Sequence, residues 1–144
     1  MTLNVREPRN ESEYSQYYDL RWRILREPWA QSKDSERDQF EQEATHLGAW
    51  RDGVLVGVGR IHFISPEEAQ IRYMAVDNGL AGQGIGGAIL DELELRAAAR
   101  GATHIVLNAR ETAVPFYSKH GYAETGPSAV LFGRIPHRLM RKDL

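Results

Sequence analysis

The stretch Arg72-Tyr-Met-Ala-Val-Asp-Asn-Gly-Leu-Ala-Gly-Gln-Gly-Ile-Gly-Gly-Ala-Ile-Leu90 combines three local patterns whose order indicates the fold. An apolar, β-prone run over 71–76 ends at a turn signal, Asp77-Asn78-Gly79. Four glycines then follow within six residues: Gly82, Gly84, Gly86 and Gly87. Beyond them, apolar residues recur at helical spacing: Ile89, Leu90, Leu93 and Ala97. The stretch therefore predicts a strand, a glycine-rich loop and a helix, in that order.

This order of elements favours an anion site at the start of the helix. The first N–H groups of a helix have no partner within it, and the helix dipole places partial positive charge beside them. Glycine adopts positive φ readily and lets a ligand approach the backbone closely. The loop therefore predicts a cradle for a phosphate or pyrophosphate.

The composition is that of an ordinary globular protein, and at 144 residues we expect one domain over 1–144. A net charge of −2 argues against non-specific binding of nucleic acid. No leader pattern or apolar run of membrane-spanning length is present, so we expect neither a secretory leader nor a membrane anchor. The chain has no cysteine, which excludes disulfides and thiolate metal sites. We expect a cytoplasmic protein without a bound metal.

Elsewhere in the chain, the hydrophobic period and the turn residues predict a mixed α/β fold with a mostly antiparallel central sheet. The expected strands are 3–6, 46–51, 54–64, 69–76, 104–108, 122–125 and 139–142. The expected helices are 11–26, begun by a capping-box-like Asn10 and Glu13, the helix after the glycines, and 113–120, capped by Thr112. One strand–helix–strand crossover is expected, and it should be right-handed.

Residues 30–45 are acidic and nearly devoid of large apolar side chains. Such a segment favours a solvated helix or loop, with an acidic rim that attracts a cationic substrate as the alternative.

Gly82, Gly84 and Gly87 also satisfy the dinucleotide fingerprint G-x-G-x-x-G. A nicotinamide- or flavin-dependent enzyme is therefore an alternative. It fits less well, because some 70 residues precede the loop and the following strand ends in Asn108 rather than an acidic residue.

Four blocks resemble the signatures of the GNAT superfamily, the Gcn5-related N-acetyltransferases, in order and spacing over nearly the whole chain. They are Tyr73-Met-Ala-Val76, Gly82-Gln-Gly-Ile-Gly-Gly87, Val106-Leu-Asn108 and Ala113-Val-Pro-Phe-Tyr-Ser-Lys-His-Gly-Tyr122. The ending Gly133-Arg-Ile-Pro-His-Arg-Leu-Met140 is similar, more loosely, to a bacterial branch like ElaA. The family loop Q/R-x-x-G-x-G/A falls on 81–86, where Ala81 replaces the usual Gln or Arg.

The resemblance implies the acyl-CoA N-acyltransferase fold and transfer of an acetyl group from acetyl-CoA to a primary amine by direct attack in a ternary complex. It implies that backbone groups of one strand and of the glycine loop bind acetyl-CoA, with further residues on the next strand and helix. These residues are Met74, Ala75, Val76, Gly82, Gln83, Gly84, Ile85, Gly86, Gly87, Asn108, Phe116, Tyr117 and Lys119.

The resemblance also places Tyr117 at the position of a phenolic general acid. The general base stays open, because Gln70 occupies a position that often carries glutamate in the family. We choose His137, with His62, Glu68, His120 or a water chain as alternatives.

The expected acceptor is a small-molecule amine or a peptide or protein amine, near Arg21, Trp22, Trp29, Arg72 and His137. A non-catalytic acyl-CoA-binding sensor or partner subunit is the rival function. The oligomeric state stays open, with a homodimer as the default expectation.

Overall fold

The computed structural model describes residues 2–144, which form one seven-stranded sheet in the order β1-β2-β3-β4-β5-β7-β6. The strands are β1 (Leu3–Arg6), β2 (Thr45–Arg51), β3 (Val54–Phe63), β4 (Glu68–Val76), β5 (His104–Arg110), β6 (Ala123–Leu131) and β7 (Ile135–Asp143). The helices are α1 (Glu11–Leu25), α2 (Ile85–Ala99) and α3 (Val114–Lys119). Among the described residues, β4 and β5 are the only strands that pair in parallel, and α2 forms the crossover between them. The expected mixed, mostly antiparallel fold is confirmed, and a doubly wound parallel sheet is excluded.

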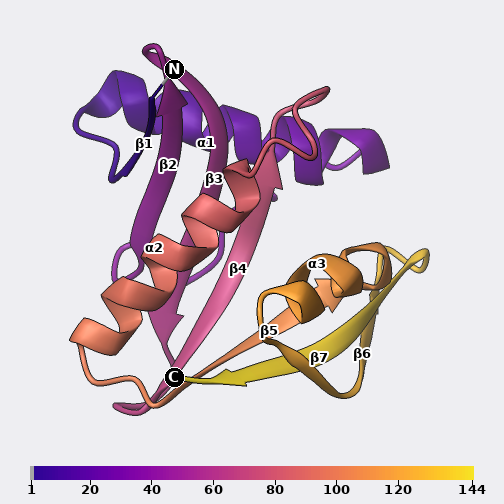
Figure 1. Ribbon diagram of the computed structural model, residues 1–144. Helices are drawn as coiled ribbons and strands as arrows, with labels where there is room; N and C mark the ends of the chain where they lie inside the picture. Colours follow the sequence, from indigo (N-terminus) through magenta and orange to yellow (C-terminus); the bar gives the residue numbers. More distant parts are fainter. Residues whose placement is uncertain (1) are drawn as a thin grey trace.

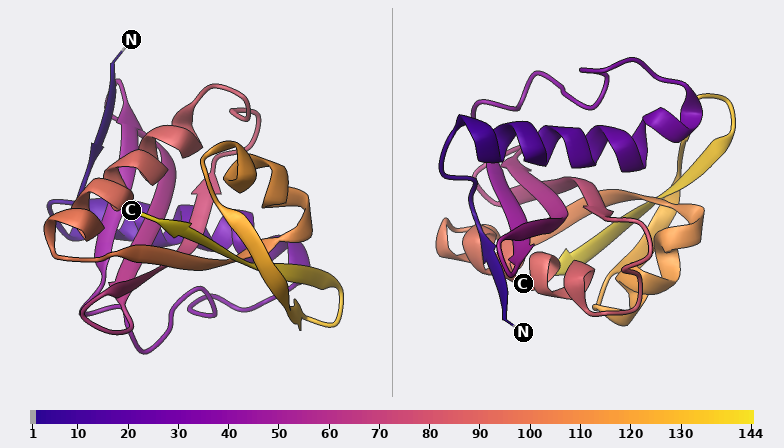
Figure 2. Two further views of the ribbon diagram at one scale, coloured as in Figure 1. Left: turned by 60° about the horizontal axis from the view of Figure 1, so that its bottom comes forward. Right: turned by 90° about the horizontal axis from the view of Figure 1, so that it is seen from above.

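Helices α1 and α2 cover opposite faces of the β1–β4 half of the sheet (Figures 1 and 2). The larger apolar core lies under α2 and includes Ile85, Ile89 and Leu93, none of them more than 1% exposed. A smaller core under α1 is built around Tyr17 and Leu20. Strands β3 and β4 are therefore packed between two apolar layers, one under each helix. This packing fixes the position of the loop between β4 and α2.

A bulge in β4 separates the carboxyl half of this strand from its amino half. The pairing with β3 shifts register between Val58 and Arg60, and Tyr73 on the facing strand has a φ of 59°. A bulky residue with positive φ is strained, and an extra residue reverses the face to which the following side chains point. Accordingly Ile71 packs in the core under α2, whereas Ala75 packs in the core under α1.

Strands β4 and β5 separate beyond this bulge. Their parallel pairing begins at Glu68 and His104 and ends at Ile71 and Leu107. Figure 1 shows β4 diverging from β5, β7 and β6 above the paired ends. Among the described residues, the backbone of 73–76 therefore keeps unpaired polar groups on the side that faces β5.

Several expected boundaries were wrong. The helix α3 begins at Val114 after a 3₁₀ turn (Glu111–Ala113), and Thr112 makes no capping hydrogen bond. Strand β5 continues two residues beyond Asn108, which is therefore not at its end. The last two strands run nine residues each instead of four. No helix within residues 2–144 is long and apolar enough to cross a membrane.

The acidic segment 30–45 forms a loop of turns, one of the two expected forms, but its carboxylates fold against the protein. Asp38 accepts hydrogen bonds from Arg60, at 2.6 and 3.0 Å, and from Arg72 at 2.7 Å. Glu41 accepts from Arg21 at 3.0 Å and from Arg60 at 2.7 Å. Arg21 and Arg60 are fully buried, so the carboxylates of this segment compensate charge inside the protein.

Candidate active site

The loop between β4 and α2 presents a row of free backbone N–H groups. The first bond of α2 runs from the Ala88 N–H to the Gly84 carbonyl at 3.1 Å. Within residues 2–144, the N–H groups of 82–87 make no hydrogen bond. Gly84, the N-cap, has a φ of 79°, a left-handed conformation that glycine adopts without strain. The six N–H groups therefore form a cradle suited to an oxyanion, at the positive end of a 15-residue helix.

The cradle opens into a cavity of about 660 Å³ between β4, the start of α2 and α3, which we call the cradle cavity. Most of the residues expected to bind acetyl-CoA line it: Met74, Ala75, Val76, Gly82, Gly84, Ile85, Gly86, Gly87, Phe116, Tyr117 and Lys119. Two of the expected residues do not line it. The exposed Gln83 accepts a hydrogen bond from Arg51 at 2.6 Å, and Asn108 lies in a second cavity.

The second cavity, of about 240 Å³, lies where β4 and β5 have separated, and we call it the cleft cavity. Its lining comes from the end of α1, from β4 and β5, from β6 and from His137 on β7. Met74, Ala113 and Tyr117 line both cavities. The cradle cavity and the cleft cavity therefore adjoin at these three residues. A ligand that extends from the cradle along β4 would end beside the cleft cavity.

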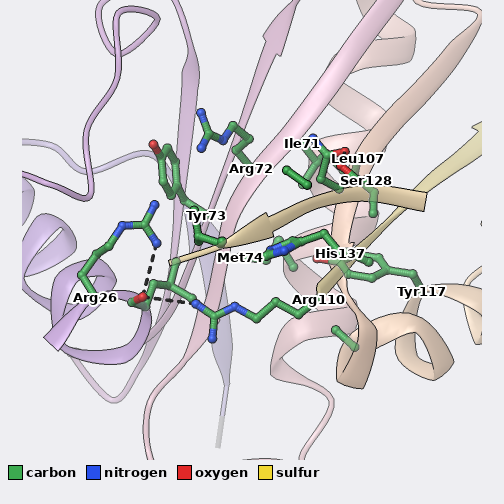
Figure 3. Close-up of a pocket in the computed structure, with 16 residues that line it drawn as sticks. Arg26, Ile71, Arg72, Tyr73, Met74, Leu107, Arg110, Tyr117, Ser128 and His137 are labelled. Carbon is green, nitrogen blue, oxygen red and sulfur yellow. Dashed lines mark hydrogen bonds between the residues drawn. The ribbon is translucent and has the colours of Figure 1, made fainter. Parts of the chain in front are cut away.

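Tyr117 lies at this junction, on α3 (Figure 3). The residue is 8% exposed, and its hydroxyl makes no hydrogen bond within residues 2–144. Burial raises the pKa of the Tyr117 phenol far above its usual range. The hydroxyl is therefore protonated at neutral pH and free to donate a proton or hydrogen bond to a ligand.

His137 projects into the cleft cavity from β7 (Figure 3). Its Nδ1 lies 2.9 Å from the Ile135 carbonyl oxygen. Because a carbonyl oxygen only accepts, Nδ1 carries the proton, and Nε2 of the neutral ring has the free lone pair. This arrangement suits a proton acceptor.

The other candidate bases lie elsewhere. His62 is 1% exposed, accepts a hydrogen bond from Arg60 and stacks on Phe40, and burial lowers its pKa. Glu68 lies 3.0 Å from His104, outside both cavities. His120 lines the cradle cavity, whereas His137 lines the cleft cavity.

The cleft cavity differs from the expected acceptor site. Arg72 and His137 line it, as expected, but Arg21, Trp22 and Trp29 do not. Asn108 is present, and its side-chain oxygen accepts a hydrogen bond from Ser128 at 2.9 Å, which ties β5 to β6. Two arginines of the lining, Arg26 and Arg110, were not predicted from the sequence.

Residues missed in the cradle cavity are Leu80, Ala81, Ala88, Asp91, Ala113 and His120. Most adjoin residues that were expected, so helical spacing from Gly84 and Phe116 would have found Ala88, Asp91 and His120. No local signal marks Arg26 or Arg110, because an arginine at the end of a helix or strand is typical of a solvated surface.

Comparisons with known proteins agree with this geometry. A model of the Acetyltransferase (GNAT) family matches residues 14–122. The uncharacterized N-acetyltransferase YjcF of Bacillus subtilis (strain 168) is 31% identical over 135 residues, covering 94% of this chain and 96% of YjcF.

Among solved structures, an aminoglycoside 6'-N-acetyltransferase complexed with coenzyme A superposes with a TM-score of 0.81 at 20% identity, covering 99% of this chain and 97% of the other. Escherichia coli ElaA superposes with a TM-score of 0.79 at 17% identity, covering 99% of each chain. These two likenesses show a shared fold, while membership of an ElaA-like branch stays a prediction.

Proposed function

The chain belongs to the acetyltransferase (GNAT) family, and we propose that it transfers an acetyl group from acetyl-CoA to a primary amine by direct attack in a ternary complex. The observation that carries this proposal is the meeting of two cavities at the point where β4 and β5 separate. One cavity holds an oxyanion cradle and the other a histidine with a free Nε2, and Tyr117 lies between them.

The cradle cavity fits the cosubstrate acetyl-CoA. The free N–H groups of 82–87 suit its pyrophosphate. The unpaired backbone of 73–76 suits the amides of its pantetheine arm, which would add to β4 as a neighbouring strand does. The coenzyme A complex of the aminoglycoside 6'-N-acetyltransferase, which shares this fold, supports the same assignment. Because these contacts use backbone groups, Ala81 does not weaken this proposal.

Starting from R–NH₃⁺, the reaction removes two protons from the amine nitrogen and delivers one proton to the sulfur. The amine enters mostly as R–NH₃⁺ and must lose a proton to attack, which we assign to His137 Nε2 directly or through water. The amine nitrogen then forms a bond to the thioester carbonyl carbon and the carbon–sulfur bond breaks. The leaving thiolate takes a proton from the Tyr117 hydroxyl, and the second proton of the amine nitrogen passes to the Tyr117 phenolate, directly or through water. His137 gives the first proton to solvent, and the products are the N-acetylated amine and CoA.

Thermal unfolding with acetyl-CoA, CoA or NADH added separately tests the cosubstrate. A ligand at 100 times its dissociation constant stabilises a protein by about 2.7 kcal/mol, which raises the melting temperature by several degrees. We expect a shift with acetyl-CoA and CoA and none with NADH. A shift with NADH alone would overturn the proposal.

Release of CoA from acetyl-CoA in the presence of a broad panel of amines tests the reaction. Turnover with any amine supports the transferase. A melting shift with acetyl-CoA but no turnover with any amine would favour the rival function, a non-catalytic acyl-CoA-binding sensor or partner subunit.

A further inference from the structure

The lining of the cleft cavity carries positive charge without an acidic residue. Arg26, Arg72 and Arg110 contribute to it, and its 16 lining residues include no aspartate or glutamate. A primary amine enters as a cation, so a lining of this kind repels it unless the acceptor brings an anionic group of its own. The charge of this cavity therefore bears on the chemical class of the acceptor.

Arg26 and Arg110 have no carboxylate partner. Within residues 2–144 neither forms an ion pair, and Arg26 is only 6% exposed. Both donate to the Leu25 carbonyl oxygen at the end of α1, Arg26 from Nη1 at 3.3 Å and Arg110 from Nη2 at 3.2 Å. Figure 3 shows the two guanidinium groups converging on this oxygen. Arg26 also donates from Nε to the Ser35 carbonyl oxygen at 3.1 Å and lies over the rings of Tyr73 and Phe132. Two like charges are thus held beside the cavity, next to carbonyl oxygens, aromatic rings and the negative end of a helix dipole but without a carboxylate in contact.

Glu36 is the carboxylate whose charge acts on Arg26, but its hydrogen bonds go to other residues. Burial lowers the pKa of Arg110, and the neighbouring charge of Arg26 lowers it further. The buried Glu36 accepts a hydrogen bond from Arg37 at 3.0 Å and does not pair with Arg26. A buried charge without a partner is costly, so a ligand that supplies the missing negative charge would be bound favourably.

Arg72 does not restore neutrality. Its partner Asp38 also pairs with Arg60, and Glu41 pairs with both Arg60 and Arg21. Three guanidinium groups therefore share two carboxylates in this network, which leaves an excess of one positive charge behind the cavity. This excess adds to the charges of Arg26 and Arg110.

From this arrangement we propose that the acceptor is a small amine that carries an oxyanion, a carboxylate or a phosphate, bound by Arg26 and Arg110 while its amine meets His137. The inference rests on the proposed acetyltransferase function and names the substrate class of the same site. Guanidinium groups match carboxylate and phosphate oxygens in paired hydrogen bonds. Arg110 and His137 lie opposite each other in the β5–β7 ladder, which favours a short separation between the anion and the amine. Polycationic amines are disfavoured by the same charges.

A competition among matched amines tests the proposal with the full chain. We would measure CoA release with L-amino acids against their amides, phosphoethanolamine against ethanolamine, and spermidine as a polycation, correcting each rate for the fraction of free amine. We expect the oxyanion-bearing member of at least one pair to have a kcat/KM at least tenfold higher than its neutral analogue. The two kinds of pair separate carboxylate from phosphate acceptors. Preference for neutral amines or spermidine would overturn the inference.

Charge-removing variants connect this preference to the two arginines. Arg26→Gln and Arg110→Gln should each lower the ratio of kcat/KM for the anionic over the neutral amine at least tenfold. Arg138→Gln is the matched control, because Arg138 pairs with Glu124 outside the cavity, and the ratio should not change. An unchanged ratio in both Arg26→Gln and Arg110→Gln would contradict the proposal. Because the Arg26 side chain is buried, Arg26→Gln could lower the melting temperature strongly. In that case the ratio of kcat/KM values measured in Arg110→Gln alone tests the proposal.

Calorimetric titration separates failure of this inference from failure of the proposed function. If no amine is turned over, the same amino acids and phosphoethanolamine are titrated into the protein with CoA present. Binding that is lost in Arg110→Gln supports the anion site even without transferase activity, and absence of binding overturns it. Absence of CoA binding, by contrast, overturns the proposed function.

Discussion

Tyr117 lines both cavities, and we propose that it is the general acid of the reaction. Its hydroxyl makes no hydrogen bond within residues 2–144, and burial keeps it protonated at neutral pH. General acids contribute about 10²- to 10⁴-fold to the rate of such reactions. We expect Tyr117→Phe to lower kcat about 10²- to 10⁴-fold with the dissociation constant for acetyl-CoA nearly unchanged, as measured by CoA release and calorimetry. Wild-type kcat in this variant would remove Tyr117 from the mechanism.

We propose His137 as the base, with Nε2 as the atom that accepts the proton. Because removal of a general base lowers the rate and alters its pH dependence, we expect His137→Gln to lower kcat/KM about 100-fold or more and to change the shape of the pH–rate profile. His104→Gln is the control, because His104 pairs with Glu68 away from both cavities. A pH–rate profile identical in the wild type and His137→Gln would exclude His137 and leave a water chain as the base.

The residues of the site divide into those that local patterns predict and those they do not. The glycine loop and Tyr117 were placed because each belongs to a motif of adjacent residues, strand–loop–helix or helix. Arg26 and Arg110 are 84 positions apart in the chain and meet at the Leu25 carbonyl only because the sheet separates between β4 and β5. Neither arginine is distinguished from a surface residue by its neighbours in sequence, so the cationic cavity could not be predicted.

At the element scale, the binding of acetyl-CoA by the loop before α2 can be tested separately from the contribution of this loop to stability. Gly84 and Gly53 both have a φ of 79°, and a Cβ would meet no atom within 4 Å at either position. Gly84→Ala and Gly53→Ala should therefore cost similar amounts, about 1–2 kcal/mol, because alanine is strained at this φ.

Only Gly84 belongs to the cradle, whereas Gly53 lies in the β2–β3 turn. We expect calorimetry to show weaker acetyl-CoA binding in Gly84→Ala and wild-type binding in Gly53→Ala. Equal affinities in the two variants would mean that the conformation of Gly84 does not support the cradle.

Elements with a clear period were predicted well, whereas elements shaped by distant contacts were not. The β2–β3 hairpin, β4 and α2 follow from alternation and helical spacing within each segment. Strands β6 and β7 were predicted too short because Pro127 and Pro136 interrupt the β pattern, although pairing with a neighbouring strand extends through both. The acidic segment lacked a pattern altogether, because its conformation depends on arginines from α1, β3 and β4.

At the scale of the whole molecule, this acidic segment couples the core to the active site. Asp38 bonds at once to the fully buried Arg60 and to Arg72, which lines the cleft cavity. Removing Asp38 leaves Arg60 with Glu41 as its only carboxylate partner among the described residues. The segment therefore stabilises the fold and contributes to the charge beside the cleft cavity. Protonation of its carboxylates should change both the stability and this charge.

Stability should consequently fall as the pH is lowered, in two ranges. Burial lowers the pKa of His46 and His62 below the usual 6.5, so the unfolded chain binds more protons and stability begins to decline below about pH 6.5. For Asp38, burial acts to raise the pKa, but hydrogen bonds from Arg60 and from the Phe40 N–H outweigh it and lower the pKa from 3.8 to about 2. Its contribution is complete above about pH 4 and is lost as the pH falls towards 2.

Asp38→Asn tests the lower range. We expect this variant to be less stable than the wild type at pH 7 by about 1–3 kcal/mol, because a buried guanidinium group loses a charged partner. Between pH 4 and 2 its stability should fall less steeply than that of the wild type, because the unfolded chain no longer gains a proton at this position. Urea unfolding at a series of pH values measures both effects, with Glu124→Gln, which removes an exposed ion pair, as the control. Parallel curves for Asp38→Asn and the wild type would show that the acid sensitivity arises elsewhere, and Arg60 would then depend on Glu41 for its charge compensation.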